Sequence, residues 1–202
     1  MPSGFFKQPA AGPVAAGPLG LAGDEQADKR VHGGADKAVY AYPSEGYAAW
    51  IEDFPARART LTPGGMGENL VTAGLSEDEL RIGDVLRIGG ALLQVTQPRQ
   101  PCFKLGLYHR EPRMVRRMIE TGRCGWYMRV LEPGLLAAGD RVEIVERQEK
   151  GWSIRHFAAH IALKTIDAEA LSEIVAMPGI AENWKLRALR LLAETKGVHQ
   201  PQ

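Results

Sequence analysis

The hydrophobic pattern of the chain changes at about residue 148. Before that point, apolar residues come in short runs that Gly and Pro interrupt, such as Val85 to Ile88 and Ala91 to Thr96 on either side of Gly89-Gly90. Two such runs around a Gly-Gly turn predict a β-hairpin. Several of them in succession favour a closed β-barrel, which we place in residues 1–147.

Two helices are predicted in the connections of this barrel. Pro43 and Pro112 can each open a helix, because proline is well tolerated in the first turn. Apolar residues then recur with the i, i+3, i+4 spacing of a helix face. These residues are Tyr47, Trp50 and Ile51 in the first helix, and Val115, Met118 and Ile119 in the second.

Residues 148–202 have the pattern of three short amphipathic helices. Ser153 and Asp167 are suited to cap the first two, and Pro178-Gly179 precedes the third. We interpret this stretch as a small C-terminal domain that docks its apolar stripes on the barrel. Its charges are of both signs, which weakens a DNA-binding interpretation.

Composition narrows the range of functions. The chain has 202 residues, a net charge of +1 and only two cysteines, with no CxxC pair. Such a charge gives no overall attraction to nucleic acid or anionic lipid, so any anion site must be local. A disulfide framework or a zinc site is not expected, and neither a signal peptide nor a membrane span is recognised. We expect a cytoplasmic protein, monomeric or homodimeric, that binds no nucleic acid.

Cys102 is the main candidate for chemistry. Pro98 and Pro101 stiffen its loop, and Arg99 and Lys104 place two cations close to it in sequence. A thiolate is both a nucleophile and a soft metal ligand, and neighbouring positive charge favours it. These residues alone agree better with a small apolar side chain under a loop, because free cysteine is often buried. Metal ligation is the sharper hypothesis.

Two glycine-containing loops could approach a bound group closely. One is His32-Gly33-Gly34 with Lys37, which can offer backbone N–H groups and a cation to an anion, although a plain turn explains it equally well. The other runs from Pro63 to Leu70 and includes Glu68, and a buried sharp turn would explain it as well. It is not a Walker loop, because no Gly-Lys-Ser/Thr follows, and it is not a dinucleotide fingerprint, because no strand and helix bracket it correctly. The second cysteine, Cys124, is expected to pack rather than react, and a disulfide with Cys102 stays open.

The ordered set of motifs resembles the MOSC domain family, named for the C-terminal domain of molybdenum cofactor sulfurase, and in particular its bacterial YiiM-type subgroup. The resemblance implies a mainly β (α+β) fold, with a MOSC-type barrel followed by a three-helix domain. The motifs that carry it are Gly20-Leu21 with Gly23 to Gln26, Val31 to Gly34 with Asp36 to Val39, Gly67 to Leu70, Ile82 to Asp84, Gln94 to Arg99 with Pro101 to Leu105, and Gly122 to Tyr127 with Arg129-Val130.

The same resemblance implies roles for individual residues. Cys102 matches the thiolate ligand of molybdenum in a pterin-type cofactor, and His32 is a candidate proton donor. The resemblance places the other matching residues around the cofactor, with the cations suited to its phosphate. They are Gly33, Gly34, Lys37, Glu68, Asn69, Arg99, Lys104 and Arg123.

The implied activity is the molybdenum-cofactor-dependent reduction of N-hydroxylated compounds, such as 6-hydroxylaminopurine, to amines. The chain has no flavin or nicotinamide signature, so it would need an external flavoprotein or iron–sulfur reductase as electron donor, and pyridoxal phosphate is not expected. Two alternatives stay open. The protein could carry sulfur or the cofactor without turnover, or it could be a non-catalytic interaction module.

Overall fold

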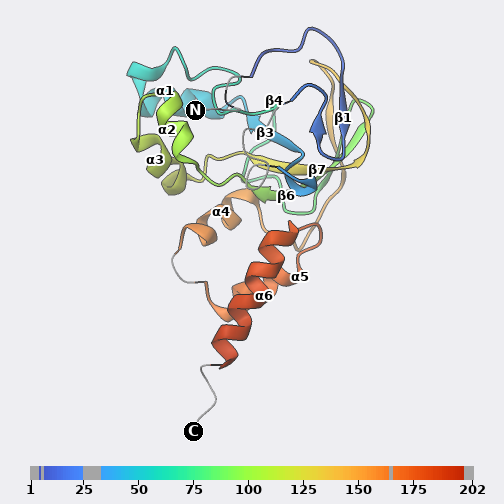
Figure 1. Cartoon of the computed structure of the whole chain (residues 1–202), viewed down its shortest axis with the longest axis vertical. Helices are drawn as coiled ribbons and strands as arrows, with labels where there is room; N and C mark the ends of the chain where they lie inside the picture. Colours follow the sequence, from blue (N-terminus) through green and yellow to red (C-terminus); the bar gives the residue numbers. More distant parts are fainter. Residues whose placement is uncertain (1–4, 6, 25–32, 164–165, 198–202) are drawn as a thin grey trace.

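A computed structural model of the chain describes residues 5, 7–24, 33–163 and 166–197. Its strands curl into a half-barrel made of two sheets (Figure 1). The larger sheet has the order β4-β3-β7-β6-β5-β9, with only β3 and β4 parallel, and the smaller has the order β2-β1-β8. The strands are β1 (Val14–Gly17), β2 (Gly20–Leu21), β3 (Val39–Pro43), β4 (Leu70–Thr72), β5 (Val85–Ile88), β6 (Ala91–Pro98), β7 (Trp126–Glu132), β8 (Gly134–Leu136) and β9 (Val142–Glu146).

The predicted hairpin is present as β5 and β6, with Ile88 paired to Ala91 across the turn. Gly89 in this turn has φ 52°, a conformation that favours glycine. A Cβ atom on Gly89 would also lie only 2.6 Å from the carbonyl oxygen of Leu135 in β8. Glycine is therefore required at position 89 for two reasons, its backbone angle and the close approach of the second sheet.

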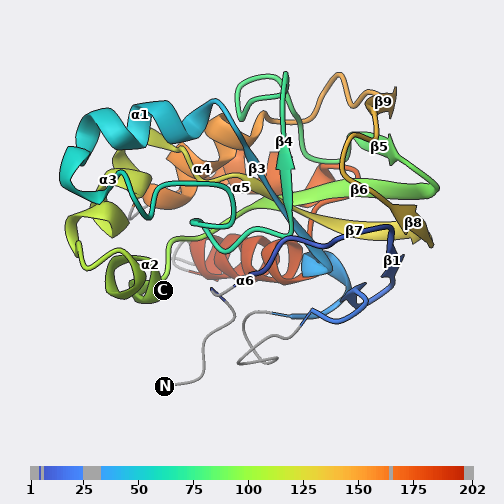
Figure 2. The same ribbon diagram turned by 90° about the horizontal axis from the view of Figure 1, so that it is seen from above.

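The helices form two groups. Figure 2 shows α1, α2 and α3 together at one end of the sheets, and Figure 1 shows α4, α5 and α6 along one side, with α6 extending towards the C-terminus. Two short 3-10 helices, η1 and η2, lie in the connections. The bounds are η1 (Ala35–Lys37), α1 (Gly46–Asp53), η2 (Pro55–Arg57), α2 (Phe103–Tyr108), α3 (Arg113–Thr121), α4 (Ile154–Ala162), α5 (Ala168–Ala176) and α6 (Glu182–Gly197).

The first two C-terminal helices, α4 and α5, begin where their capping residues predict. The Ser153 hydroxyl accepts a hydrogen bond from the backbone N–H of His156 at 3.1 Å, and the Asp167 carboxylate accepts one from Ala170 N at 2.8 Å. These bonds satisfy N–H groups that a helix start leaves without an internal partner.

The core runs from the sheets into the C-terminal helices. Trp126 of β7, Leu93 of β6, Phe157 of α4 and Trp184 of α6 belong to one buried cluster. The apolar stripes of the helices therefore face the barrel, as the sequence predicts. None of the helices in the described residues has the length and apolar character of a membrane span.

The α+β architecture is confirmed, with three differences in detail. "Mainly β" is too narrow, because the described residues form six α-helices. The described strands make a curled two-sheet half-barrel rather than one closed sheet. The buried face of α3 is formed by Met114 and Met118, whereas Ile119 is 44% exposed, because the helix is rotated relative to the predicted face.

Candidate functional site

Cys102 lies between the end of β6 and the start of α2. It is the residue directly before the helix, its backbone is extended, and its carbonyl accepts a hydrogen bond from Leu105 N at 2.9 Å. The thiol is free and the side chain is half-buried. The backbone is thus fixed by the helix start while the sulfur keeps access to a ligand.

Arg99, three residues before Cys102, is a buried cation. Its guanidinium carbon lies 5.3 Å from the ring centroid of Phe5 and 5.2 Å from that of Tyr40, and Nη1 is 3.7 Å from Met118 Sδ. The residue is 6% exposed, and no carboxylate in the described part of the chain pairs with it. Aromatic faces stabilise a cation, but they do not neutralise its charge.

The electrostatics around Arg99 favour a bound anion. Burial lowers the pKa of Arg99, but nearby Tyr40, Tyr127 and Cys102 raise it by more, so the guanidinium stays charged. A buried charge without a counter-ion is costly, and an anionic group next to it removes much of that cost. Arg99 is therefore the residue of this region best suited to attract an anion.

Tyr127 of β7 connects Arg99 with the loop that follows the two glycines. Its ring centroid lies 5.2 Å from that of Tyr40, and Lys37 Nζ is 6.0 Å from the Tyr127 centroid. Lys37 is half-buried, and this burial lowers its pKa. Lys37, Tyr127, Tyr40 and Arg99 thus form a continuous series of neighbours that ends beside Cys102.

The glycine loop itself is only partly described, because His32 lies outside the described residues. Gly34 has φ 98°, and a Cβ atom there would meet no heavy atom within 4 Å. Positive φ, not crowding, therefore favours glycine, and the space beside Gly34 is open. The 3-10 helix η1 begins directly after Gly34, and Lys37 N donates a hydrogen bond back to Gly34 O at 2.9 Å.

Glu68 stabilises its own loop. Its buried carboxylate accepts hydrogen bonds from the hydroxyl of Tyr47, from Gly64 N at 2.7 Å and from Met66 N at 3.0 Å. Three donors from the protein use most of the capacity of a carboxylate. The geometry gives Glu68 a positioning role in the loop rather than one at the surface of the site.

Asn69 joins three segments. Its side-chain oxygen accepts a hydrogen bond from Tyr40 N at 2.9 Å, and its side-chain nitrogen donates to Asp24 at 2.9 Å. Asp24 in turn forms an ion pair with Lys7. Asn69 therefore holds the strand that carries Tyr40, one of the two rings in contact with Arg99.

The other two predicted cations differ from Arg99 in their surroundings. Arg123 pairs with Asp53, and its guanidinium lies 4.6 Å from the ring centroid of Trp50. Its charge is thus balanced within the protein, at α1. Lys104 lies in the first turn of α2, two residues after Cys102, and is half-buried.

His109 was not recognised in the sequence. It is 1% exposed at the end of α2, with Nε2 2.8 Å from Gly65 O and Nδ1 2.7 Å from the Thr60 hydroxyl. Burial, then the neighbouring cations Arg99 and Arg57, lower its pKa, so the ring is neutral near pH 7. His109 ties the helix that begins at Cys102 to the loop of Glu68. No spacing pattern in the sequence indicates this contact.

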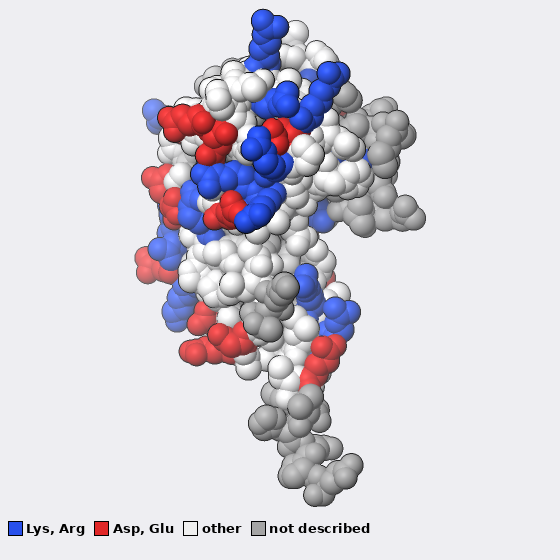
Figure 3. Space-filling model, turned by 90° about the vertical axis from the view of Figure 1, so that its left-hand side faces the viewer, with Lys and Arg blue, Asp and Glu red and all other residues white. Residues whose placement is uncertain are grey.

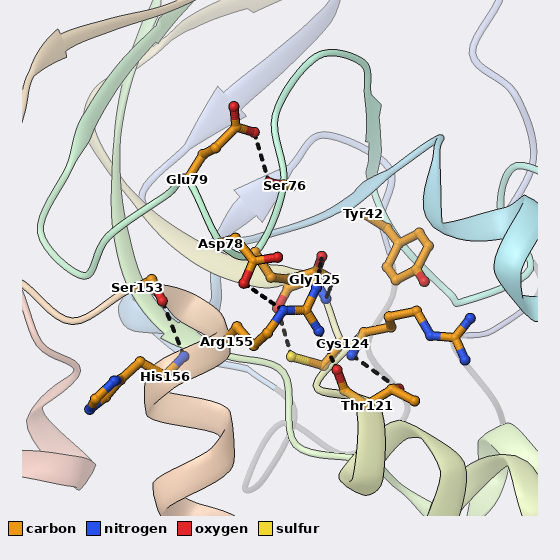
Figure 4. Close-up of polar contacts among 12 residues, drawn as sticks. Tyr42, Ser76, Asp78, Glu79, Thr121, Cys124, Gly125, Ser153, Arg155 and His156 are labelled. Atoms are coloured by element: carbon orange, nitrogen blue, oxygen red, sulfur yellow. Dashed lines mark hydrogen bonds and ion pairs between the residues drawn. The ribbon is translucent and has the colours of Figure 1, made fainter.

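Cys124 is part of a structural network, as predicted. Burial raises the pKa of its thiol, and the next residue, Gly125, donates its N–H to the buried Glu77 at 2.9 Å. Figure 4 shows Arg155 of α4 beside this turn; it donates to Asp78 at 2.7 Å and to the carbonyl of Thr121. Both cysteines are free, so the disulfide that the sequence left open is absent here.

The site residues therefore separate into two sets. Arg99, Cys102 and Lys37 lie around Tyr127, whereas Glu68, Asn69 and Arg123 have partners within the protein. No group of three or more His, Cys, Asp or Glu side chains suited to a metal ion occurs among the residues that the structure describes.

Comparison with known proteins identifies the family. The MOSC domain model matches residues 28–143. Protein YiiM of Escherichia coli (strain K12) is 37% identical over 183 residues, which are 91% of this chain and 81% of that protein. A protein named "Reductase" from Gibberella moniliformis is 37% identical over 177 residues, or 87% of this chain, but the chain spans only 31% of that protein's length.

The fold agrees with these relatives. The crystal structure of YiiM from Escherichia coli superposes with a TM-score of 0.84 and 30% sequence identity, covering 94% of this chain and 90% of that one. Sequence and structure thus both match YiiM over most of its length. The chain belongs to the MOSC domain family, in its YiiM-type subgroup.

Proposed function

We propose that this protein is a molybdenum-cofactor-dependent reductase of N-hydroxylated compounds, such as 6-hydroxylaminopurine, with Cys102 as the thiolate ligand of the metal. The observation that carries the proposal is a half-buried free thiol three residues after a buried arginine that has no carboxylate partner in the described residues. This pair offers one soft ligand and one unbalanced positive charge.

The residues fit a cofactor better than a bare metal ion. The described residues hold no cluster of three or more protein ligands, so a metal bound to Cys102 would take most of its ligands from another molecule. A pterin-type cofactor supplies such ligands together with a phosphate. Arg99 and Lys37 are the cations suited to its negative charges, and the open space at Gly34 suits close approach.

When bound, the cofactor would supply the two-electron chemistry that breaks the N–O bond. Reduction of an N-hydroxylated amine consumes two electrons and two protons and gives the amine and water. Cys102 would hold the metal, and Arg99, which is buried against two aromatic rings, would stabilise negative charge. His32 or solvent would deliver protons. The electrons would come from a separate flavoprotein or iron–sulfur protein.

The relatives support the coarse form of this proposal. MOSC domains are associated with the molybdenum cofactor, and one relative is named a reductase. Because the chain matches only 31% of that relative, the activity of the whole relative does not transfer by similarity alone. Substrate, electron donor and a cytoplasmic location belong to the proposal.

The first test compares Cys102→Ser with Cys124→Ser, the same change of thiol to hydroxyl at a half-buried and at a buried position. Both variants are produced in a host that makes the molybdenum cofactor, and molybdenum and pterin are measured per mole of protein. We expect Cys102→Ser to lose about tenfold or more of both, because a ligand is removed, and Cys124→Ser to retain most. Undiminished cofactor in Cys102→Ser would rule out the ligand assignment.

Turnover separates the reductase from a carrier. Adenine formed from 6-hydroxylaminopurine is measured with reduced methyl viologen as an artificial donor. We expect the wild type and Cys124→Ser to form adenine and Cys102→Ser to form none. A wild type that retains cofactor but forms no adenine would favour the carrier alternative.

A further inference from the structure

The surface around α2 and α3 concentrates positive charge. Residues 102–123 contain six Lys or Arg and two Glu, although the whole chain has a net charge of only +1. Figure 3, which looks onto the end of the molecule that carries α1, α2 and α3, shows Lys and Arg side chains gathered on this face, with Asp and Glu side chains among them. The basic face consists of the exposed residues Arg110, Arg113 and Arg116.

The basic face is only partly neutralised by neighbouring acids. Arg113 pairs with Glu111 at 2.8 Å, and Arg116 pairs with Glu120 at 2.7 Å. The side chains of Arg113 and Arg116 nevertheless remain 77% and 85% exposed. Exposed pairs of this kind contribute little to stability, so the need for a stable fold does not explain the concentration of arginines.

Two large apolar side chains are exposed on α2, the helix that ends just before Arg110 in the chain. Phe103 and Leu107, four residues apart on α2, are 57% and 63% exposed. The i, i+4 spacing places both on one side of the helix. Apolar side chains with charged residues around them are the usual composition of a protein-binding surface. Because α2 begins directly after Cys102, this surface adjoins the candidate cofactor site.

We propose that the basic face, with Phe103 and Leu107, is the docking surface for an acidic electron-donor protein. This inference rests on the proposed function, which requires electrons from outside the chain. A partner with surface carboxylates would be steered to Arg110, Arg113 and Arg116, because complementary charge accelerates encounter. Its apolar contact with Phe103 and Leu107 would then place its redox group next to the helix that starts at Cys102.

The test uses the cofactor-loaded full chain and reduced flavodoxin, a small acidic flavoprotein, as the probe. The double variant Arg110→Glu/Arg116→Glu reverses two exposed charges of the basic face. Arg141→Glu is the matched control, because its side chain is 84% exposed and lies between β8 and β9, outside the basic face. Melting temperatures establish that all three proteins are folded. Adenine formation from 6-hydroxylaminopurine is measured with flavodoxin and, separately, with methyl viologen.

We expect the double variant to lose about tenfold or more of the flavodoxin-supported rate at low salt, and to keep its methyl viologen rate within about twofold. The wild-type flavodoxin rate should fall as salt rises, and Arg141→Glu should behave as wild type. An unchanged flavodoxin rate in the double variant, with normal methyl viologen turnover, would overturn the docking surface alone. Absence of methyl viologen turnover in the wild type would instead contradict the proposed function.

Direct binding completes the test, because it does not depend on turnover. Flavodoxin is titrated into wild type and double variant, and we expect measurable affinity that the double variant loses. Duplex DNA and vesicles that contain anionic lipid are titrated in parallel at physiological salt. Binding of DNA or vesicles through the same arginines, without binding of flavodoxin, would overturn the proposal in favour of a different class of partner.

Discussion

Arg99 and Arg123 both lie in motifs that match the family, but they differ in how their charges are compensated within the protein. Arg123 lies over the Trp50 ring and pairs with Asp53, which also binds Arg117. Arg99 lies against two rings and has no carboxylate in the described residues. The first charge stabilises the fold, whereas the second costs stability until an anion is bound.

This contrast predicts opposite effects for the same substitution. Arg99→Met should leave the free energy of unfolding of the cofactor-free protein unchanged or raise it by about 1–2 kcal/mol, because it removes a buried charge that has no carboxylate partner among the described residues. It should also lower the pterin content by about tenfold, because a charge-assisted contact is lost. Arg123→Met should destabilise the fold by about 1–2 kcal/mol and reduce pterin only to the extent that folding suffers.

Urea unfolding of the cofactor-free proteins and pterin analysis of the loaded ones check both parts. If Arg99→Met retained a full complement of pterin, Arg99 would not be the residue that attracts the cofactor. If Arg123→Met were as stable as the wild type, the contrast between the two arginines would fail.

At the residue scale, the sequence could indicate Cys102 but not its surroundings. The prolines and cations beside the thiol are local features, and they predict a stiff loop. The aromatic rings in contact with Arg99 belong to Phe5 and Tyr40, and the His109 ring forms a hydrogen bond with the carbonyl of Gly65. These neighbours are distant in sequence, and no periodicity links them to Cys102. Only the resemblance to a family predicted that these loops lie around one site; the local sequence pattern did not.

At the element scale, local signals predicted α1, α3, α4, α5 and α6 and missed α2. Ser153 and Asp167 both cap helices through their side chains. The helix α2 is six residues long, contains Gly106 and begins after Cys102 without a side-chain cap. Its sequence therefore gives no clear helix signal. Its stability comes instead from packing on α3 and from the buried side chain of Leu105.

Asp36 connects the glycine loop to the last helix. It lies in η1, two residues after Gly34, accepts a hydrogen bond from Glu182 N at the start of α6 at 2.8 Å, and pairs with Arg129 at 2.7 Å. One carboxylate thus joins the candidate site to the C-terminal helices. We infer that these helices hold the loop in position.

Asp36→Ala and Asp167→Ala form a matched pair that tests this role. Each removes a carboxylate that accepts from a helix N–H, so each should cost about 1–2 kcal/mol in the free energy of unfolding, although Asp36→Ala also removes the ion pair with Arg129. Only Asp36→Ala should also lower the pterin content, because only Asp36 belongs to the loop beside Lys37. Equal pterin contents in two equally destabilised variants would show that α6 does not support the site.

At the scale of the whole molecule, the sequence divides the chain at residue 148, and that boundary remains a prediction. The change of sequence pattern corresponds to a change in secondary structure. All the described strands precede residue 148, and only the helices α4, α5 and α6 follow it. The contacts across it are extensive, however. Ile154 N and Arg155 N donate to the carbonyls of Leu80 and Glu77, both at 2.9 Å.

A further contact between the two regions lies just before α6. Ala181 N, just before α6, donates to Thr96 O of β6 at 3.1 Å. The side chains of Phe157 and Trp184 meet with ring centroids 5.3 Å apart, inside the cluster that includes the barrel core. Separation of the two regions would expose these rings and leave backbone groups without their partners.

We therefore expect the full chain to unfold in one cooperative transition. Calorimetry of the cofactor-free protein should give one peak whose calorimetric and van't Hoff enthalpies agree. Phe157→Ala should move the whole peak to lower temperature by removing about 3–5 kcal/mol of stability, because a buried ring is lost from a shared core. Leu186→Ala, at a 57% exposed position of α6, is the control and should leave the peak nearly unchanged. Two resolved peaks, with only one of them shifted by Phe157→Ala, would show instead that the helices fold as a separate domain.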